Sequence, residues 1–399
     1  MNSSSSSRQT TVALVRCSSY ENNEVEQAVR RGIDLLGGVR QFARYGEKIL
    51  LKPNLLNARR PELNVTTHPA VIRAVAQTLK DAGIAVSIGD SPSRGRLEEI
   101  YRITGVRDLA AELNLIIADF DHGKTVSFPD GRQNKQFFIA EGVLAADGLI
   151  NLPKFKTHHL TRLTAAVKNL YGCIPGLNKL EFHVRLPSVE EFSRLLVDLS
   201  AYLKPRLTIL DAIEAMEGNG PSSGTTRKMN LIALSADPVA LDSVVCHLVD
   251  LSPEMVRTNY YGEQFGLGVS DLSRIRLIGD AAEEFILPDF DVQRTPMMRF
   301  NLAWRYRFLK NFISPRPVID DDQCRKCGDC VTQCPLQPKA LRWSDEGKSQ
   351  PPVYDYSTCI RCFCCQEVCP HSAIAVETPL ILKLIEFFYR VFTRSWHVR

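Results

Sequence analysis

The sequence lacks any long apolar run. Apolar segments such as Val143–Ala146 are far shorter than the roughly 20 residues that a membrane-spanning helix requires. Residues 1–8 are a serine tract without a basic segment, and the apolar stretch Val12–Val15 is too short for a signal peptide. We therefore expect a cytoplasmic protein in which residues 1–9 form a disordered tail.

An excess of one charge is also absent. The chain has 49 basic and 45 acidic residues, and its net charge of +4 does not favour nucleic acid as a partner. Glycine and proline are sparse, at 23 and 22 of 399 residues, and 44% of the residues are apolar. This composition excludes a disordered or collagen-like chain and predicts two or three globular domains.

Cysteine is scarce in most of the chain and dense in one part of it. Cys17, Cys173 and Cys246 precede residue 318, whereas nine cysteines lie between residues 324 and 369. Disulfides would require an export signal, so this density is typical of thiolates that bind metal in a reducing compartment. The sequence therefore predicts a separate metal-binding domain in the C-terminal part of the chain.

The dense region contains the same cysteine spacing twice. The two runs are Cys324-x2-Cys327-x2-Cys330-x3-Cys334-Pro335 and Cys359-x2-Cys362-x2-Cys365-x3-Cys369-Pro370. In such a run three closely spaced thiolates bind one cubane and the fourth binds the other. We therefore assign Cys324, Cys327, Cys330 and Cys369 to cluster 1, and Cys359, Cys362, Cys365 and Cys334 to cluster 2. Two structural zinc sites are the alternative, but zinc ribbons do not require the x3-Cys-Pro element.

Residues 318–378 resemble the bacterial two-cluster ferredoxin family, including the proline after each fourth cysteine. The resemblance implies a small α+β ferredoxin-like domain, two 4Fe-4S clusters and electron transport to or from a redox partner protein. Two features depart from the family pattern: the additional thiol of Cys364 and the four prolines between Pro335 and Thr358. Because Cys365 keeps both spacings of the motif, we expect Cys364 to be a packed thiol that binds no iron.

Residues 10–290 alternate short β-rich segments with amphipathic helical segments. This pattern predicts an α/β domain with a helix-covered, mostly parallel sheet. Helices are expected to begin at Thr67-His68-Pro69 and at Asp237-Pro238. The expected strands are Thr11–Cys17, Lys48–Lys52, Ile84–Ile88, Leu115–Ala118, Gly148–Leu152, Leu207–Leu210, Asn230–Leu234 and Arg274–Ile278.

Four polar strings lie at or beyond the carboxyl ends of expected strands. They are Lys52-Pro53-Asn54, Gly89–Pro92, Asn151–His158 and Glu217–Pro221. Ligand sites of open parallel sheets lie at these strand ends, so we expect one shared cleft. Its expected basic lining is Lys52, Lys154, Lys156, Lys168, His158 and Arg162, and its expected carboxylates are Asp90, Asp211, Glu217, Asp237 and Asp242.

Such a lining would suit a small anionic substrate accompanied by a divalent cation. The predicted catalytic residues are Lys52, Asp90, Lys154 and Lys168. The predicted substrate-binding residues are Asn54, Lys156, His158, Asn169, Asn219 and Asp242.

Each of these features also has a simpler structural interpretation. Gly89–Pro92 would be a turn, Asp237 a helix N-cap, Lys168-Asn169 a helix end, Gly218–Gly224 a flexible turn, His158-His159 a solvated pair, and Cys173 a buried structural thiol.

The polar strings resemble, in the same order, the family called domain of unknown function 362, over about residues 10–285. The motifs that carry the resemblance are Lys52-Pro53-Asn54, Gly89–Pro92, Lys154–His158, Lys168-Asn169 with Tyr171-Gly172, and Glu217–Pro221 followed by Asp237–Asp242. Members of this family often carry a ferredoxin domain, and their reaction is not established. The resemblance therefore supports the domain assignment and leaves the reaction open.

Three functions fit these observations. The first is an iron-sulfur oxidoreductase whose clusters exchange electrons with a substrate in the α/β domain. The second is a non-catalytic electron-transfer subunit that docks on a larger redox complex. The third is a redox-sensing or cofactor-maturation factor.

Two basic segments flank the cysteine-rich domain of residues 318–378. Residues 291–317 are expected to form a basic amphipathic linker and residues 379–399 a C-terminal amphipathic helix. We expect both to pack on the cysteine-rich domain through Trp304, Phe308, Phe312, Phe388 and Phe392. The alternatives are peripheral contact with an anionic membrane surface and contact with a partner enzyme.

Overall fold

The computed structural model describes residues 9–92, 95–176, 178–294, 314–385 and 387. The chain divides into two compact units. The first comprises residues 1–179 and 188–291, and the second comprises residues 180–187 and 292–399. The helix α7 (Asn178–Arg185) crosses the boundary between them.

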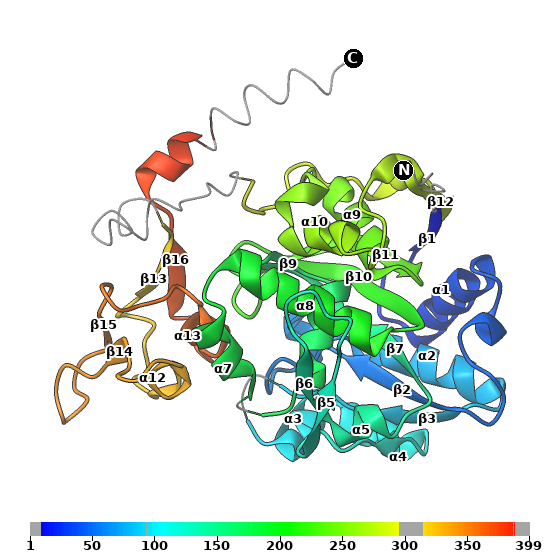
Figure 1. Cartoon of the computed structure of the whole chain (residues 1–399), viewed down its shortest axis with the longest axis horizontal. Helices are drawn as coiled ribbons and strands as arrows, with labels where there is room; N and C mark the ends of the chain where they lie inside the picture. The colour runs from blue at the N-terminus through cyan, green and yellow to red at the C-terminus, as the bar shows by residue number, and fades with distance from the viewer. Residues whose placement is uncertain (1–8, 93–94, 177, 295–313, 386, 388–399) are drawn as a thin grey trace. The chain divides into compact units, whose positions relative to one another are not determined.

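The first unit is built on one large sheet (Figure 1). Its main path has the order β12-β1-β11-β10-β7-β2-β3-β4, and β8 and β9 extend it from β10. The strands are β1 (Thr10–Arg16), β2 (Lys48–Pro53), β3 (Ala85–Ile88), β4 (Ile116–Ile117), β7 (Gly148–Leu152), β8 (Lys154–His158), β9 (Arg162–Thr164), β10 (Leu207–Glu217), β11 (Thr225–Ser235) and β12 (Ile275–Gly279).

Most neighbouring strands in this sheet are parallel, which confirms the predicted fold class. β11 is antiparallel to both β1 and β10, and β9 is antiparallel to β8. All eight expected strands are present, but β10 and β11 are longer than expected. Four strands were not expected from the sequence: β8, β9, and the separate hairpin of β5 (Gly123–Ser127) and β6 (Gln136–Ala140).

Apolar side chains alternate between the two faces of the sheet. On β2, Ile49 and Leu51 pack into a core with residues of α1 and α2, whereas Leu50 packs on the other side with Leu170 and Cys173. Since both faces are covered there, β2, β7 and β8 are almost continuously buried, whereas β4 and β12 are largely exposed or half-buried. The helices of this unit are α1 (Asn22–Leu35), α2 (Pro69–Asp81), α3 (Leu97–Ile103), α4 (Val106–Glu112), α5 (Glu141–Leu144), α6 (Ala166–Asn169), α8 (Val189–Leu203), α9 (Pro238–Leu248) and α10 (Arg257–Gln264).

The two predicted helix starts are confirmed. His68 caps α2 by accepting a hydrogen bond from the Ala70 amide, and Asp237 caps α9 by accepting from the amides of Val239 and Ala240. Both helices have proline in their first turn, where its missing amide proton costs nothing.

The described residues of the second unit include two small antiparallel sheets and two short helices that carry parts of the cysteine motifs. One sheet pairs β13 (Arg316–Ile319) with β16 (Ile374–Glu377), and the other pairs β14 (Leu341–Arg342) with β15 (Val353–Tyr354). The helices are α12 (Asp329–Gln333) and α13 (Cys364–Glu367). This small α+β arrangement agrees with the expected fold class.

Several expectations concern residues outside the described part of the chain. These are most of the predicted tail, the central part of the basic linker, and Trp304, Phe308, Phe312, Phe388 and Phe392. Among the described residues no helix is long and apolar enough to cross a membrane.

Candidate functional site

Lys52 lies at the carboxyl end of β2 and is completely buried. Its Nζ forms an ion pair with Oδ1 of Asp90 at 2.6 Å and donates to Oδ1 of Asn169 at 3.2 Å. Asp90 follows β3, which is the parallel neighbour of β2, so the two strand ends bring the pair together. The other oxygen of Asp90 accepts from the Leu55 amide at 2.7 Å, which fixes the carboxylate.

The loop that contains Asp90 is held by the segment after α6. The Ser91 amide donates to the carbonyl of Gly172, and Nζ of Lys179 donates to the carbonyls of Ser91 and Pro92 and to the Ser91 hydroxyl. The Gly89–Pro92 and Tyr171–Gly172 strings, far apart in the sequence, therefore form one packed structure.

A second buried ion pair joins β8 and β10. Lys154 and Asp211 are register partners on these parallel strands, and Nζ of Lys154 lies 3.2 Å from Oδ2 of Asp211. Both residues are completely buried. Burial lowers the pKa of Lys154, and the charge of Asp211 acts against this shift. The pair thus contains an amine that is easier to deprotonate than an exposed lysine.

Tyr20, which the sequence analysis did not identify, completes this pair. Its hydroxyl accepts from Nζ of Lys154 at 2.5 Å and donates to Oδ1 of Asp211 at 2.9 Å. The Tyr20 ring stacks on the imidazole of His68, with ring centroids 3.8 Å apart. Because Tyr20 and His68 are both half-buried, they connect the buried pair to the surface of the unit.

Two further residues of this polar network, Asn64 and His68, were not predicted as site residues from the sequence. Asn64 accepts from Lys154 through Oδ1 and donates to Glu214 at 2.6 Å, and His68 donates its backbone amide to Asp211. Tyr20 lies just beyond the carboxyl end of β1, so the strand-end rule could have found it. Asn64 lies in the loop between β2 and α2, where no such signal exists.

Lys156 lies two residues after Lys154 and is also completely buried. Its Nζ donates to Oδ1 of Asn54 at 2.7 Å and to the carbonyl of Val65 at 2.6 Å. Lys52, Lys154 and Lys156 therefore do not line the expected shared cleft. These three lysines form buried polar contacts instead of a solvent-exposed basic lining.

Lys168 and Asn169 end α6, as expected, and differ in burial. Lys168 is half-buried, whereas Asn169 is buried and donates to Oδ1 of Asn151 and to the Lys52 carbonyl. Asn169 therefore positions Lys52 directly.

Asp242 supports the other end of α6. Its two oxygens accept from the amides of Ala166 and Val167 at 2.6 and 3.1 Å. Burial raises the pKa of Asp242 to about 7. Since both oxygens are bonded to the helix start, these contacts assign Asp242 a role in holding α6, and we do not retain it as a substrate ligand.

His158, which ends β8, and His159 differ from the expected solvated pair. His158 is buried, and its Nδ1 accepts from the amides of Leu160 and Thr161. His159 is half-buried and lies 3.0 Å from Oδ1 of Asn219. Asn219 belongs to the Gly218–Gly224 turn, which Thr157 holds by donating to the Gly218 carbonyl.

The remaining predicted groups of the first unit are structural or lie at the edge of the polar network. Asp237 caps α9, Arg162 is buried, and Glu217 ends β10 and accepts from the Asp291 amide. Cys173 is completely buried, and burial raises the pKa of its thiol to about 12, so it is not poised as a nucleophile.

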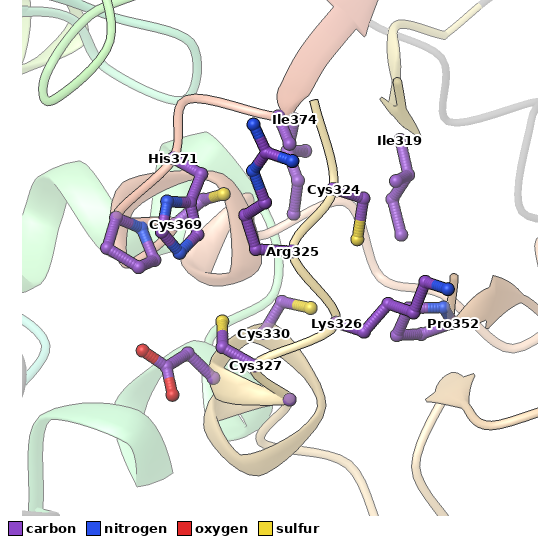
Figure 2. Close-up of a pocket in the computed structure, with 14 residues that line it drawn as sticks. Ile319, Cys324, Arg325, Lys326, Cys327, Cys330, Pro352, Cys369, His371 and Ile374 are labelled. Carbon is purple, nitrogen blue, oxygen red and sulfur yellow. The ribbon is translucent and has the colours of Figure 1, made fainter. Parts of the chain in front are cut away.

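The thiols assigned to cluster 1 line one pocket of the second unit. Cys324, Cys327 and Cys330 of the first motif face this pocket together with Cys369 of the second motif (Figure 2). Cys330 and Cys369 are far apart in the sequence, and the fold brings them to the same pocket. The assignment requires this, because the fourth cysteine of one motif binds the cluster of the other. Ile319, Ile374 and Ala373 supply an apolar wall, which suits the low-polarity surroundings of a cluster.

The thiols assigned to cluster 2 lie in the second motif and at the end of the first. Cys359 and Cys365 are buried, Cys362 and Cys334 are half-buried, and Cys334 packs against a small core that includes Cys365. Burial and the nearby thiolates of Cys362 and Cys359 raise the pKa of the Cys365 thiol. Such neighbouring thiols are stable as thiolates when iron compensates their charge.

The backbone conformation of the first cysteine motif is repeated in the second. Lys326 and Arg361, each two residues after the first cysteine, have φ of 55° and 63°. Gly328 and Phe363, each four residues after it, have φ of 80° and 62° and precede α12 and α13. Cys365 is therefore the structural equivalent of Cys330, and Cys364 is the equivalent of Asp329. This equivalence supports the assignment of Cys365 as the iron ligand.

No three or more His, Cys, Asp or Glu side chains of the described residues are arranged to hold a single metal ion. A 4Fe-4S cluster requires a different arrangement, because each of its irons binds one protein thiolate. The thiols around the pocket are arranged in this way.

Comparisons with known proteins agree with this division of the chain. A family model described as a domain of unknown function (DUF362) matches residues 49–247, and a 4Fe-4S dicluster domain matches residues 316–371. A thylakoid-associated protein, sll1697 of Synechocystis sp., is 36% identical over 257 residues, which cover 64% of this chain and 79% of that protein.

Two shorter relatives match the cysteine-rich region. A ferredoxin of Pyrobaculum islandicum is 43% identical over 60 residues, and the pyruvate synthase subunit PorD of Methanocaldococcus jannaschii is 34% identical over 59 residues. Each match covers 15% of this chain, and they cover 51% and 63% of the relatives. Among solved structures, the lactate racemase apoprotein of Thermoanaerobacterium thermosaccharolyticum aligns with a TM-score of 0.37 and 13% identity, over 60% of this chain and 57% of that one.

Proposed function

The chain belongs to the DUF362 family and carries a 4Fe-4S dicluster domain that supports electron transfer, and from this premise we propose that it is an oxidoreductase. In this proposal the two clusters exchange electrons with a small anionic substrate bound by the first unit. The buried network around Tyr20, Lys154 and Asp211 supplies or accepts the accompanying protons.

The observation that carries the proposal is the burial of Lys52 at the end of β2 and of Lys154 and Lys156 on β8. Removing an ammonium group from water costs several kcal/mol, and an ion pair recovers this cost only in part. A pure folding role is served as well by apolar residues of similar size. Several buried lysines with a shifted pKa among them therefore favour a chemical role.

Tyr20 is the group best placed to pass a proton between this network and a substrate. Its hydroxyl bridges Lys154 and Asp211, and its half-buried ring extends toward the surface beside His68. In this proposal the clusters held by the second unit would supply two electrons, the Tyr20 hydroxyl would donate one proton and be reprotonated by Lys154, and solvent would supply the second proton.

The substrate-binding groups in this proposal are six polar side chains of the first unit. They are Lys168, Asn54, Lys156, His158, Asn169 and Asn219, and Asn169 also accepts from Lys52, which is paired with Asp90. A divalent cation would enter with the anion, because the described residues offer no preformed set of three ligands for it.

The redox partner in this proposal is a protein that meets the second unit near Cys327. All twelve cysteines lie in the described part of the chain, and among them Cys327 alone is exposed. Electron transfer requires a close approach, so an exposed cluster ligand favours this position for the external donor or acceptor.

The experiment is an anaerobic screen for small anions that reoxidise the dithionite-reduced protein, followed by the visible absorption of the clusters. The proposal predicts that at least one small anion reoxidises both clusters in the full chain. If no small anion does so while an oxidised ferredoxin or flavodoxin does, the protein is an electron carrier and the proposal is wrong.

We also propose that the protein associates peripherally with membranes through its C-terminal segment. Residues 380–385 and 387 are helical, and Leu380, Ile381 and Leu384 are 77%, 51% and 58% exposed. In the sequence that follows, residues 388–399 combine apolar and aromatic residues with three arginines and no acid. This combination favours an anionic lipid surface, and the thylakoid association named for the relative is consistent with it.

A further inference from the structure

The two cysteine motifs are preceded by equivalent strand ends. Ile319 ends β13 five residues before Cys324, and Tyr354 ends β15 five residues before Cys359. The residues that follow repeat the same hydrogen bonds, since the amides of Cys324 and Cys359 donate to the carbonyls of Asp320 and Asp355, both at 3.0 Å. Ile319 and Tyr354 therefore occupy the same position relative to their motifs.

These two equivalent residues have different chemistry. Ile319 lines the pocket of Cys324, Cys327, Cys330 and Cys369, and its side chain offers only methyl and methylene groups (Figure 2). Tyr354 lies beside the other set of thiols, and its hydroxyl donates to Sγ of Cys365 at 3.3 Å. The two motifs thus have the same cysteine spacing, but the surroundings of the two clusters differ.

We propose that Tyr354 raises the reduction potential of cluster 2 through the hydrogen bond from its hydroxyl to the sulfur of Cys365. Reduction adds one electron to the cluster and makes it more negative. A hydrogen bond to a ligand sulfur stabilises the more negative state, so the cluster accepts its electron more readily. At cluster 1 the equivalent position carries Ile319, which cannot donate such a bond.

The position of Tyr354 is fixed by its neighbours. Its backbone on β15 pairs with Leu341 of β14, and its ring stacks on Tyr356 with centroids 5.4 Å apart. Tyr356 uses its own hydroxyl elsewhere, because that group donates to the carbonyl of Pro317 at 2.8 Å. Tyr356 is therefore a matched control that shares the ring packing and lacks the bond to sulfur.

The test is an anaerobic redox titration of the full chain followed by EPR, with iron and sulfide measured on each preparation. Tyr354→Phe is expected to lower one of the two midpoint potentials and to leave the other unchanged, with the iron content preserved. Tyr354→Ile, which copies Ile319, is expected to lower the same midpoint. Tyr356→Phe is expected to change neither.

Two results would overturn the proposal. One is an unchanged pair of midpoints in Tyr354→Phe, which would mean that the bond does not affect the cluster. The other is an equal shift in Tyr356→Phe, which would assign the effect to ring packing. Both results leave the proposed reaction in the first unit untouched, because this inference depends on the clusters alone.

Discussion

Gly172 lies so close to Asp90 that a side chain at this position would displace the buried ion pair. A Cβ on Gly172 would overlap Oδ1 of Asp90 and would lie 2.7 Å from Nζ of Lys52. The Gly172 carbonyl also accepts from the amide of Ser91 at 3.0 Å, so the backbone itself must approach closely. Position 172 therefore requires glycine, because the segment after α6 covers the buried pair of Lys52 and Asp90.

Gly172→Ala should lower the free energy of unfolding of the first unit by about 1–3 kcal/mol, because the added methyl group overpacks a buried ion pair. Urea denaturation followed by far-UV circular dichroism measures this change. Gly347→Ala is the control, since a Cβ there meets Asp345 at an ordinary 3.4 Å. Equal stabilities of the Gly172→Ala variant and the parent would contradict the described packing.

The titration of Asp242 should lower the free energy of unfolding as the pH rises toward 7. Its pKa of about 7 in the folded chain lies above the usual 3.8, so between these values the unfolded chain has released a proton that the folded chain keeps. The free energy of unfolding should therefore decrease by up to about 1.4 kcal/mol per pH unit below pH 7 and level off above it. Urea denaturation between pH 5 and 8 measures this slope.

The matched variants are Asp242→Asn, which cannot ionise, and Asp108→Asn on the exposed surface of α4. Asp242→Asn should have a shallower slope below pH 7, whereas Asp108→Asn should keep the slope of the parent. Identical slopes in all three proteins would show that Asp242 does not titrate near pH 7.

Anaerobically prepared protein should contain about eight irons and eight sulfides per chain, since both motifs are complete. Cys364→Ser should preserve this content because Cys364 is the equivalent of Asp329, and Cys365→Ser should lose about half of it. Iron and acid-labile sulfide assays measure both. Retention of eight irons in Cys365→Ser together with loss in Cys364→Ser would reverse the assignment, and two zinc ions per chain would refute the clusters.

Anionic vesicles should bind the full chain at low salt and release it at high salt. Leu384→Glu should weaken this binding because it places a charge in the exposed apolar helix face, whereas Leu63→Glu, which alters a leucine 50% exposed in the first unit, should not. Flotation with vesicles of phosphatidylglycerol and phosphatidylcholine, compared with phosphatidylcholine alone, measures the binding. No flotation of the parent protein at low salt would remove the membrane proposal and leave packing within the chain as the alternative.

Much of the fold could be predicted from local patterns. The β-rich segments gave all eight expected strands, and the proline-containing starts of α2 and α9 were correctly placed. β8 was missed because Lys154, Lys156 and His158 alternate with Phe155 and Thr157, a pattern that local reasoning reads as polar. In the fold these polar side chains are buried among partners from distant segments, and their hydrogen bonds allow the strand to form in the interior.

The candidate site was predictable only in part for a related reason. Lys52 and Asp90 could be paired because they end adjacent parallel strands, and Lys154 could be placed near them. Tyr20 lies 191 residues from Asp211 in sequence, and Asn64 lies 150 residues from Glu214, so no spacing rule connects them. The cysteine motifs could be recognised because iron-sulfur geometry imposes a fixed spacing on a short segment, and the structure brings the four thiols assigned to cluster 1 around one pocket.

The most direct test of the account is the rate at which a small anionic acceptor reoxidises the reduced clusters in Tyr20→Phe and in a control, Tyr45→Phe, whose ring is 79% exposed. Removing the Tyr20 hydroxyl leaves Lys154 paired with Asp211, so the fold and iron content should persist. If Tyr20 transfers the proton, the reoxidation rate should fall by about 10²-fold or more, with no change in Tyr45→Phe. Equal rates in Tyr20→Phe, Tyr45→Phe and the parent would contradict a catalytic role for this buried network.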